Sequence, residues 1–189
     1  MNRVPVIIEG LCYILSRLHK LDKIHLVKLM YLADKYHLMN YGRTISGDDF
    51  NALPHGPAGS KTVDILEFDS YVLGNYMSMA RKLLKKGKKY EYLPGRECSV
   101  KQLEMLSMSD IEALDFAIEN FGSMDQWKVV DYTHELPEWK PFKPLFDKKQ
   151  TRIEPIKTEH VLLSPDDKYF SVSKKHIEES LKILTGAAN

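Results

Sequence analysis

The segment with the clearest chemical potential is Pro54-His55-Gly56-Pro57, in which two prolines and a glycine restrict the backbone around one histidine. A histidine held in this way can serve as a pre-organised contact for a partner, or as an acid or base. Asp48 and Asp49 lie a few residues upstream. In the simpler interpretation, which we favour, His55 donates a hydrogen bond to Asp48 or to a carbonyl and shapes the turn.

A second histidine, His134, lies in the segment YTHELPEW. A zinc-binding helix of the metalloprotease type needs another histidine four residues later, and this segment lacks it. Trp139 is either an exposed aromatic anchor in an interface or a plug at the end of the helical core, and we favour the plug. A small metal-dependent hydrolase would need Asp48, His55 and His134 to converge in the fold.

Six bases within nine residues form the densest charged feature of the chain: Arg81, Lys82, Lys85, Lys86, Lys88 and Lys89. Such a cluster can contact phosphates, chiefly through the first four, and would make the chain a nucleic-acid-binding module. Bases are also favourable at the C-terminus of a helix because they complement its dipole. Since no aromatic residue is interleaved with them, we favour the solvated helix end.

The sequence contains no linear motif for nucleophilic catalysis and no glycine-rich phosphate loop. Its seven histidines show no metal-ligand spacing. Cys12 and Cys98 show none either, which suggests neither a zinc site nor a disulfide framework and indicates reduced thiols. We therefore expect a protein without metal or cofactor that is not an enzyme, although a triad can assemble from distant residues.

Length and charge set further bounds. The chain has 189 residues, enough for one domain or one domain with an appendage. Its 27 basic and 26 acidic residues give a net charge of +1, so any binding to nucleic acid would be local. Glu9, Ser16 and Arg17 interrupt the apolar residues near the N-terminus, and no signal-peptide pattern is present. We expect a cytoplasmic protein that does not bind membranes.

The apolar pattern predicts two helices near the N-terminus. Apolar residues recur at steps of three and four over residues 4–18, which is typical of a helix with one buried and one solvent-exposed face. Asp22 can cap a second helix, in which apolar residues over 24–38 extend almost around the circumference. Asn40 and Gly42 mark its end. This second helix is predicted to lie at the centre of a bundle.

Four polar side chains interrupt the predicted central helix, namely Lys28, Asp34, Lys35 and His37. Lys28 and Asp34 lie close to its apolar ring. A partly buried pair in this position is more commonly structural than catalytic, and we predict a structural role.

Further along, Pro57 suits the first turn of a third long helix that ends near Lys86. The segment KYEYL, residues 89–93, alternates like a strand, and residues 161–172 are compatible with a small hairpin around residues 164–167. Three capping boxes predict three short helices. They pair Ser99 with Gln102, Ser109 with Glu112, and Ser123 with Gln126.

Four prolines interrupt residues 136–157, which are predicted to form a linker over the surface. A final amphipathic helix is predicted over residues 173–184, capped by Gly186. The fold class expected from these elements is mostly α: a compact multi-helix domain around a buried central helix, with short accessory β strands or a hairpin.

Two motifs stand out in the chain. The second is DYTHELPEWK, residues 131–140. The first is the pattern GR-x-I-x-GD-x-F-x-A-x-P-x-GP, formed by Gly42, Arg43, Ile45, Gly47, Asp48, Phe50, Ala52, Pro54, Gly56 and Pro57. In this order the motifs resemble those of the Panacea domain, the SocA-like antitoxin family, which includes phage-associated GepA-like proteins. The resemblance spans roughly residues 24–140.

The resemblance implies a helical domain over residues 1–140 and a C-terminal extension over 141–189 that carries the linker and the final helix on the same core. It also implies an antitoxin of a toxin–antitoxin system, which binds a cognate toxin directly and, in one branch of the family, delivers the toxin to a cellular protease. The implied partner-binding or motif residues are Asp48, Phe50, Pro54, His55, Gly56, Pro57, His134 and Trp139.

Overall fold

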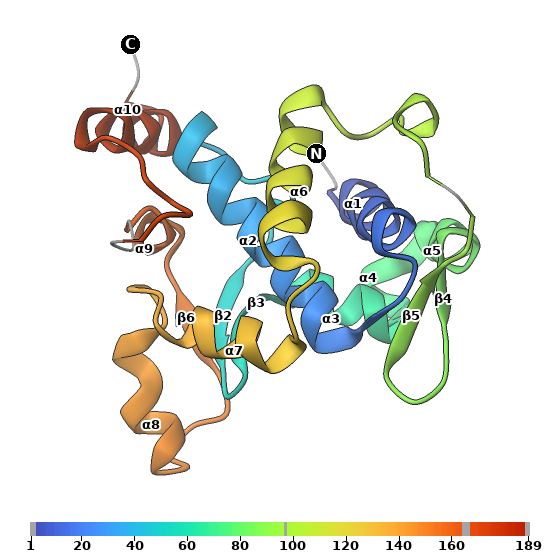
Figure 1. The fold of residues 1–189 in the computed structure, drawn as a ribbon, viewed down its shortest axis with the longest axis horizontal. Helices are drawn as coiled ribbons and strands as arrows, with labels where there is room; N and C mark the ends of the chain where they lie inside the picture. Colours follow the sequence, from blue (N-terminus) through green and yellow to red (C-terminus); the bar gives the residue numbers. More distant parts are fainter. Residues whose placement is uncertain (1–2, 97, 164–166, 188–189) are drawn as a thin grey trace.

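The computed structural model describes residues 3–96, 98–163 and 167–187. Of these residues 59% are helical, and short antiparallel strands form two small sheets. Figure 1 shows helix α2 running through the middle of the molecule, with α1 and α6 on one side and α10 against its far end. The predicted fold class is confirmed, since α2 is both central and buried.

The elements of the N-terminal half are α1 (Val4–Leu18), β1 (Leu21–Asp22), α2 (Lys23–Tyr41), β2 (Phe50–Leu53), β3 (Gly56–Gly59), α3 (Ser60–Glu67), α4 (Ser70–Leu73), the 3-10 helix η1 (Gly74–Tyr76), α5 (Met77–Leu83), β4 (Leu84–Lys86) and β5 (Glu91–Pro94). Those of the C-terminal half are η2 (Val100–Gln102), α6 (Met108–Phe121), α7 (Gln126–His134), η3 (Lys140–Phe142), α8 (Lys143–Asp147), β6 (Glu154–Ile156), α9 (Thr158–Val161) and α10 (Lys174–Thr185).

Helix α2 is buried because α1, α3, α6, α7, α10 and β3 all pack against it. It begins at the predicted cap, where the Asp22 carboxylate accepts the backbone N–H of His25 at 3.0 Å. It ends at Gly42, whose φ of 68° lies in the left-handed region that favours glycine. Both predicted boundaries are confirmed.

Helix α1 lies where predicted, but its expected solvent-exposed face is wrong. Every residue from Val4 to Leu15 is buried, including Glu9. The segment before α6 covers the outer face of the helix. Glu9 accepts the backbone N–H groups of Glu104 and Met105 from this segment at 3.1 and 2.9 Å. These bonds replace the water that a buried carboxylate would lose.

The predicted third long helix, residues 57–86, is wrong. Pro57 lies in β3, which pairs with β2 as a hairpin, and helical structure begins only at Ser60. Phe68 adopts a left-handed φ of 59° and ends α3, and Asp69 then caps α4. Short helices that share one buried face retain a helical apolar period across their breaks. The sequence pattern therefore could not distinguish them from one long helix.

The predicted strand at residues 89–93 is confirmed in part as β5, which lies between β1 and β4 in one sheet. The capping box of Ser99 is confirmed at η2. The next box is displaced, since Ser107 and Asp110, not Ser109 and Glu112, cap α6. At α7 the cap is Asp125 and not Ser123. Polar residues are dense before both helices, so several registers satisfy the same spacing.

Residues 136–157 do not form a linker over the surface. They contain η3, α8 and β6, and β6 completes the second sheet by pairing with β2. Leu136, Trp139 and Ile156 are buried within this stretch. The prolines of η3 and α8 lie in the first turn of each helix, where the missing N–H costs no hydrogen bond.

The predicted hairpin at residues 161–172 is wrong in its described parts. Val161 ends α9, and residues 167–172 contain no strand, while residues 164–166 of the turn lie outside the described residues. The final helix is confirmed as α10, with Ser173 as its N-cap and Gly186 as its C-cap. It packs on the end of α2, where the Ser180 hydroxyl donates to the Met39 carbonyl at 2.8 Å.

The prediction of reduced thiols is wrong, because Cys12 and Cys98 form a disulfide. Cys12 lies in α1, and Cys98 lies in the segment that crosses α1 before α6. The backbone N–H of Cys98 donates to the Ser16 hydroxyl at 2.9 Å and holds this segment in place. The pairing depends on a tertiary contact across 86 positions, so the spacing of the cysteines gave no sign of it. Among the described residues, no helix is long and apolar enough to cross a membrane.

Candidate partner-binding site

The β2–β3 hairpin presents the first motif. Leu53 pairs with Gly56, so Pro54 and His55 form a two-residue turn, and both are exposed. Gly56 has a φ of 95°, and a Cβ there would lie 2.5 Å from the Thr133 hydroxyl and 2.8 Å from the Lys28 ammonium nitrogen. Only glycine fits this position, both in backbone conformation and in space.

The second motif packs directly against this hairpin. The indole N–H of Trp139 donates to the Leu53 carbonyl at 3.0 Å. The ring of His134 stacks on Trp139 with centroids 3.9 Å apart and planes 12° apart. Trp139 is 2% exposed, so it closes the core and is not an exposed anchor. The two motifs, distant in sequence, thus form one unit, which we call the motif junction: the β2–β3 hairpin with residues 133–139.

The remaining residues of the first motif hold the hairpin onto the core. The buried Asp48 carboxylate accepts the backbone N–H groups of Lys61 and Thr62, each at 2.8 Å, and the Thr62 hydroxyl at 2.9 Å. It therefore satisfies N–H groups in the first turn of α3. Phe50 is buried and packs edge-on against Tyr31, with ring centroids 5.3 Å apart. Both side chains are committed to the fold.

His55 does not make the hydrogen bond predicted for it. Its ring lies edge-on to Trp127 of α7, with centroids 5.7 Å apart, and no bond joins it to Asp48 or to a carbonyl among the described residues. The three side chains of the hydrolase hypothesis do not converge: Asp48 lies at α3, His55 at the hairpin turn and His134 under Trp139. Within the described part of the chain, no group of three histidine, cysteine or acidic side chains is arranged to hold a metal.

Lys28 lies behind the hairpin and has no acidic partner among the described residues. It is 2% exposed, and its ammonium donates to the Pro57 carbonyl at 2.6 Å. Burial moves its pKa well below the ordinary lysine value. The predicted pair with Asp34 is wrong, because Asp34 instead accepts the backbone N–H and the hydroxyl of Ser46 at 2.9 and 2.6 Å. Burial raises the pKa of Asp34 to about 7, against the effect of these two bonds.

His134 carries a second unsatisfied group in the same place. Burial lowers its pKa, and the nearby charge of Lys28 lowers it further, while a hydrogen bond with the Pro54 backbone acts in the opposite direction. Its Nε2 atom is buried and has no hydrogen-bond partner among the described residues. The motif junction therefore encloses two nitrogen groups whose hydrogen-bonding capacity the described residues do not fill.

Sequence reasoning missed a buried ion pair beside the junction. Lys35 and Glu138, both with fully buried side chains, lie 3.0 Å apart. The Glu138 carboxylate also accepts the Tyr31 hydroxyl at 2.8 Å, and the Lys35 ammonium donates to the carbonyls of Val161 and Leu163. A lysine inside an apolar helix signalled that a partner was needed. The identity of that partner, more than a hundred positions away, was not visible in the spacing.

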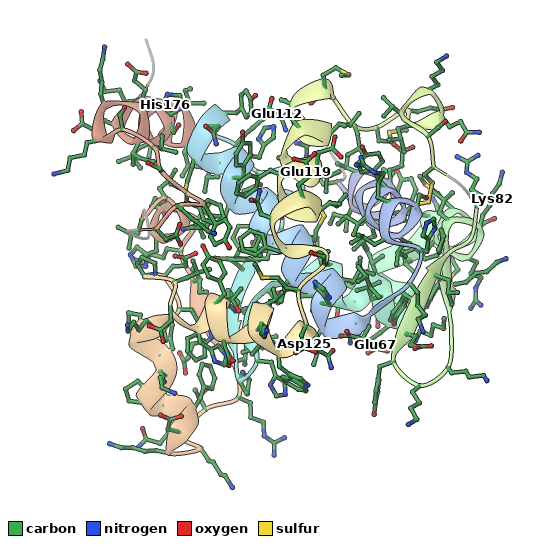
Figure 2. The ribbon with its side chains drawn as sticks, in the orientation of Figure 1. Glu67, Lys82, Glu112, Glu119, Asp125 and His176 are labelled. Carbon is green, nitrogen blue, oxygen red and sulfur yellow. A yellow bond between two sulfur atoms is a disulfide. The ribbon has the colours of Figure 1, made fainter. Side chains whose placement is uncertain are left out.

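The six bases of the basic cluster are all exposed. Only Arg81 and Lys82 lie in the last turn of α5, whereas the others lie on β4 and in the turn to β5, so the helix-end interpretation covers only two of them. Lys86 pairs with Glu67 at 3.3 Å. Figure 2 shows Lys82 beside β4 and β5, and Glu112 and Glu119 on α6 toward the middle of the view. Those two acidic residues line a groove of about 690 Å³ with Tyr36 and Tyr41 of α2.

The motif junction lies within the part of the chain that matches a known protein family. The profile of the family described as antitoxin SocA-like, Panacea domain, matches residues 26–140, which is more than half of the chain. The chain belongs to this family. The matched region includes α2, the β2–β3 hairpin and the segment from His134 to Trp139, and hence both halves of the motif junction. No curated protein matches the chain, and no solved structure does.

Proposed function

We propose that this chain is the antitoxin of a toxin–antitoxin pair and neutralises its cognate toxin by direct protein–protein binding. Membership of the SocA-like antitoxin family supports an antitoxin role in general, and that membership is the observation on which the proposal rests. The region that matches the family includes the motif junction, whose hairpin ends in an exposed turn at Pro54 and His55. A rigid turn on a packed support is suited to recognition, because little conformational freedom is lost on binding.

In this proposal the chain covers the active or substrate-binding surface of the toxin and performs no chemistry of its own. The separation of Asp48, His55 and His134 supports this, because a general acid, a base and a nucleophile must lie within hydrogen-bond reach of one reacting group. Delivery of the bound toxin to a cellular protease is a further mode of action. It would shorten the lifetime of the toxin in the cell, whereas simple masking would leave that lifetime unchanged.

Co-expression with the toxin tests the proposal. The chain should restore growth and copurify with the toxin, with an interface of at least about 1,000 Å², as specific complexes usually require. Rescue without a detectable complex would instead indicate an enzyme that reverses the chemistry of the toxin. His55→Ala and His134→Ala separate binding from catalysis: loss of rescue in a folded variant that still binds the toxin would indicate an enzyme.

A nucleic-acid-binding module is the second candidate, and the exposed basic cluster favours it. Binding through this cluster would weaken steeply with salt, because each neutralised phosphate releases counterions. Measurement of affinity for RNA and DNA at physiological salt decides the matter. If the unmodified protein shows no affinity, this candidate is excluded.

A cytoplasmic location is part of the proposal, because the antitoxin must meet a toxin that acts inside the cell. The Cys12–Cys98 disulfide is of a kind that is rare in a reducing cytosol. Thiol labelling of the protein directly after cell lysis tests this point. Labelling of both cysteines would show that they are reduced in the cell, as expected in the cytoplasm. Labelling of neither would indicate that the protein resides in an oxidising compartment.

A further inference from the structure

A small pocket lies between α2, the β2–β3 hairpin and α3. Its volume is about 250 Å³, which is more than enough for one amino-acid side chain. Most of its wall is apolar and comes from Ile24, Val27, Leu53, Pro54, Ala58 and Val63. Lys23, Lys28, His55 and Gly56 also line it, and we call this cavity the Lys28 pocket.

The ammonium of Lys28 lies directly against this wall. Its nitrogen is 2.8 Å from the place where a Cβ on Gly56 would stand, and Gly56 lines the pocket. A lysine ammonium has three N–H donors, and the only hydrogen bond it makes among the described residues is to the Pro57 carbonyl. No carboxylate in the described part of the chain lies within ion-pair distance of it. Burial favours the neutral amine of Lys28, and a carboxylate that enters the same low-dielectric space would stabilise its protonated, charged form.

The other titratable side chains that line the pocket are basic. Lys23 lies at its edge and pairs with Glu67, and Glu67 also pairs with Lys86. His55 forms part of the rim, and His134 lies behind the hairpin near Lys28. Among the residues that the structure describes, no acidic side chain lines the pocket. A carboxylate that enters would therefore meet no acidic side chain in the pocket wall.

We propose that the Lys28 pocket binds a carboxylate carried on a short apolar stem, and that in the antitoxin complex this carboxylate belongs to an acidic side chain of the toxin. The methylene groups of such a side chain would pack on the apolar wall while its carboxylate pairs with the Lys28 ammonium. A phosphate fits less well, because one base and an apolar wall would leave most of its oxygens without donors. The second part of the proposal rests on the proposed function.

A protein is favoured as the source of the carboxylate because the rim of the pocket continues into an exposed surface. His55 contacts Trp127, which is 49% exposed, and Pro54 is exposed beside them. An exposed tryptophan next to a pocket for one side chain is a typical arrangement at an interface. The toxin would place its acidic side chain in the pocket and cover Trp127 with the neighbouring surface.

The pocket is tested first with butyrate, which carries one carboxylate on a three-carbon stem. Butyrate should shift the backbone amide signals of Gly56 and Ala58 in a saturable way, whereas butanol and butylamine should not. Lys28→Met keeps the length of the side chain and removes its charge, and it should weaken butyrate binding at least tenfold. Lys61→Met is the control, since it removes a partly exposed lysine of α3 that does not line the pocket, and binding should be unchanged.

A second variant protects this test against a folding defect in Lys28→Met. Val63→Phe fills the pocket and leaves Lys28 in place, so it should also abolish the butyrate shifts. If the unmodified protein shows no saturable shift, or if folded Lys28→Met binds butyrate as well as the unmodified protein does, the carboxylate site is overturned.

The toxin is then used as the second ligand. Lys28→Met and Val63→Phe should each weaken its binding at least tenfold, and one acidic residue of the toxin should cause the same loss when changed to its amide. If both variants bind the toxin fully while losing butyrate, the pocket serves a free carboxylic acid and the assignment to the toxin is wrong. Failure of the unmodified chain to bind any toxin would refute the proposed function instead, and the butyrate result would be unaffected.

Discussion

Lys28 and Lys35 lie two turns apart on the same helix, and both are almost completely buried, with 2% and 0% of their surface exposed. Lys35 has a complete set of partners: the Glu138 carboxylate and the carbonyls of Val161 and Leu163. Lys28 has one carbonyl, that of Pro57. Burial lowers the pKa of both lysines, but only for Lys35 does an ion pair oppose the shift.

This difference in partners distinguishes a site that stabilises the fold, at Lys35, from a site at Lys28 that can still accept a partner, which we call the open site. The Lys35 site ties α2 to the segments around Glu138 and α9, so its charge is neutralised within the chain. At Lys28 the chain bears the cost of burying an amine whose charged form has no ion pair among the described residues. Natural proteins accept such a cost mainly where function requires it, which is why we assign the open site to binding.

The largest expected effect comes from breaking the complete site. Glu138→Gln keeps the shape of the side chain but leaves Lys35 as an uncompensated buried charge, so the free energy of unfolding should fall by about 3 to 5 kcal/mol. Chemical denaturation measures this loss. Lys28→Met is the matched variant, and it should leave stability unchanged or raise it. Equal losses in the two variants would mean that both lysines are structural.

The next effect concerns Tyr31, whose hydroxyl donates to Glu138 and whose ring packs on Phe50. Tyr31→Ala removes both contacts and opens a cavity, which should cost roughly 2 to 5 kcal/mol of unfolding free energy. Tyr31→Phe should lose only the hydrogen bond, about 1 kcal/mol. An unchanged melting temperature in Tyr31→Ala would show that the ring is not a core contact.

At the open site, Gly56→Val should lower the free energy of unfolding by less than the variants above, but it should also affect toxin binding. The added side chain meets the Thr133 hydroxyl and the Lys28 ammonium, and valine disfavours the positive φ of this position. Crowding of this kind costs roughly 1 to 3 kcal/mol. Toxin binding and thermal stability should both decrease. If both are fully retained, the hairpin only connects β2 to β3 and has no role in stability or binding.

The comparison also predicts a pH dependence. The pKa of Lys28 is lower in the folded protein than in the unfolded chain, so between these two values the unfolded state binds more protons. Stability contributed by this residue therefore rises with pH up to the ordinary lysine value of about 10.4, with a slope of at most about 1.4 kcal/mol per pH unit. Unfolding curves of the unmodified protein and of Lys28→Met should diverge accordingly. Parallel curves would mean that Lys28 titrates normally.

The smallest effect is expected at the exposed bases. Reversal of Lys82, Lys85 and Lys86 to glutamate should change stability by about 0.5 kcal/mol or less per site, because exposed charges contribute little. Glu67, which pairs with both Lys23 and Lys86, loses one of its two partners in this variant. The variant should bind toxin normally, and a loss of binding would move the interface to the basic cluster.

Local signals carried the successful part of the sequence analysis. A helix cap such as Asp22 or Ser173 acts on backbone groups two or three residues away, and it was recognised correctly. The apolar circumference of α2 likewise identified the centre of the fold. The breaks between α3 and α5 were missed because they depend on the left-handed Phe68 and on Gly74, while the apolar period continues across them.

The candidate site was predictable only in its outline. The PHGP turn and His134 were recognised as motif residues, but their junction through Trp139 and Leu53 is a tertiary contact. The same holds for the disulfide of Cys12 and Cys98 and for the pair of Lys35 and Glu138, whose partners are far apart in the chain. Lys28 attracted attention as a polar residue near an apolar ring. The carboxylate it lacks became evident only from the folded structure.

The most direct test of neutralisation by binding is a titration of purified toxin activity with this chain. A binding antitoxin should reduce activity linearly and abolish it at a fixed molar ratio, with a complex of that ratio seen by light scattering. The Lys28→Met variant should abolish toxin activity only when it is added at a much higher concentration than the unmodified chain. Complete inactivation of the toxin by much less than one molar equivalent of this chain would contradict the account. Each molecule of the chain would then inactivate many toxin molecules, as an enzyme does.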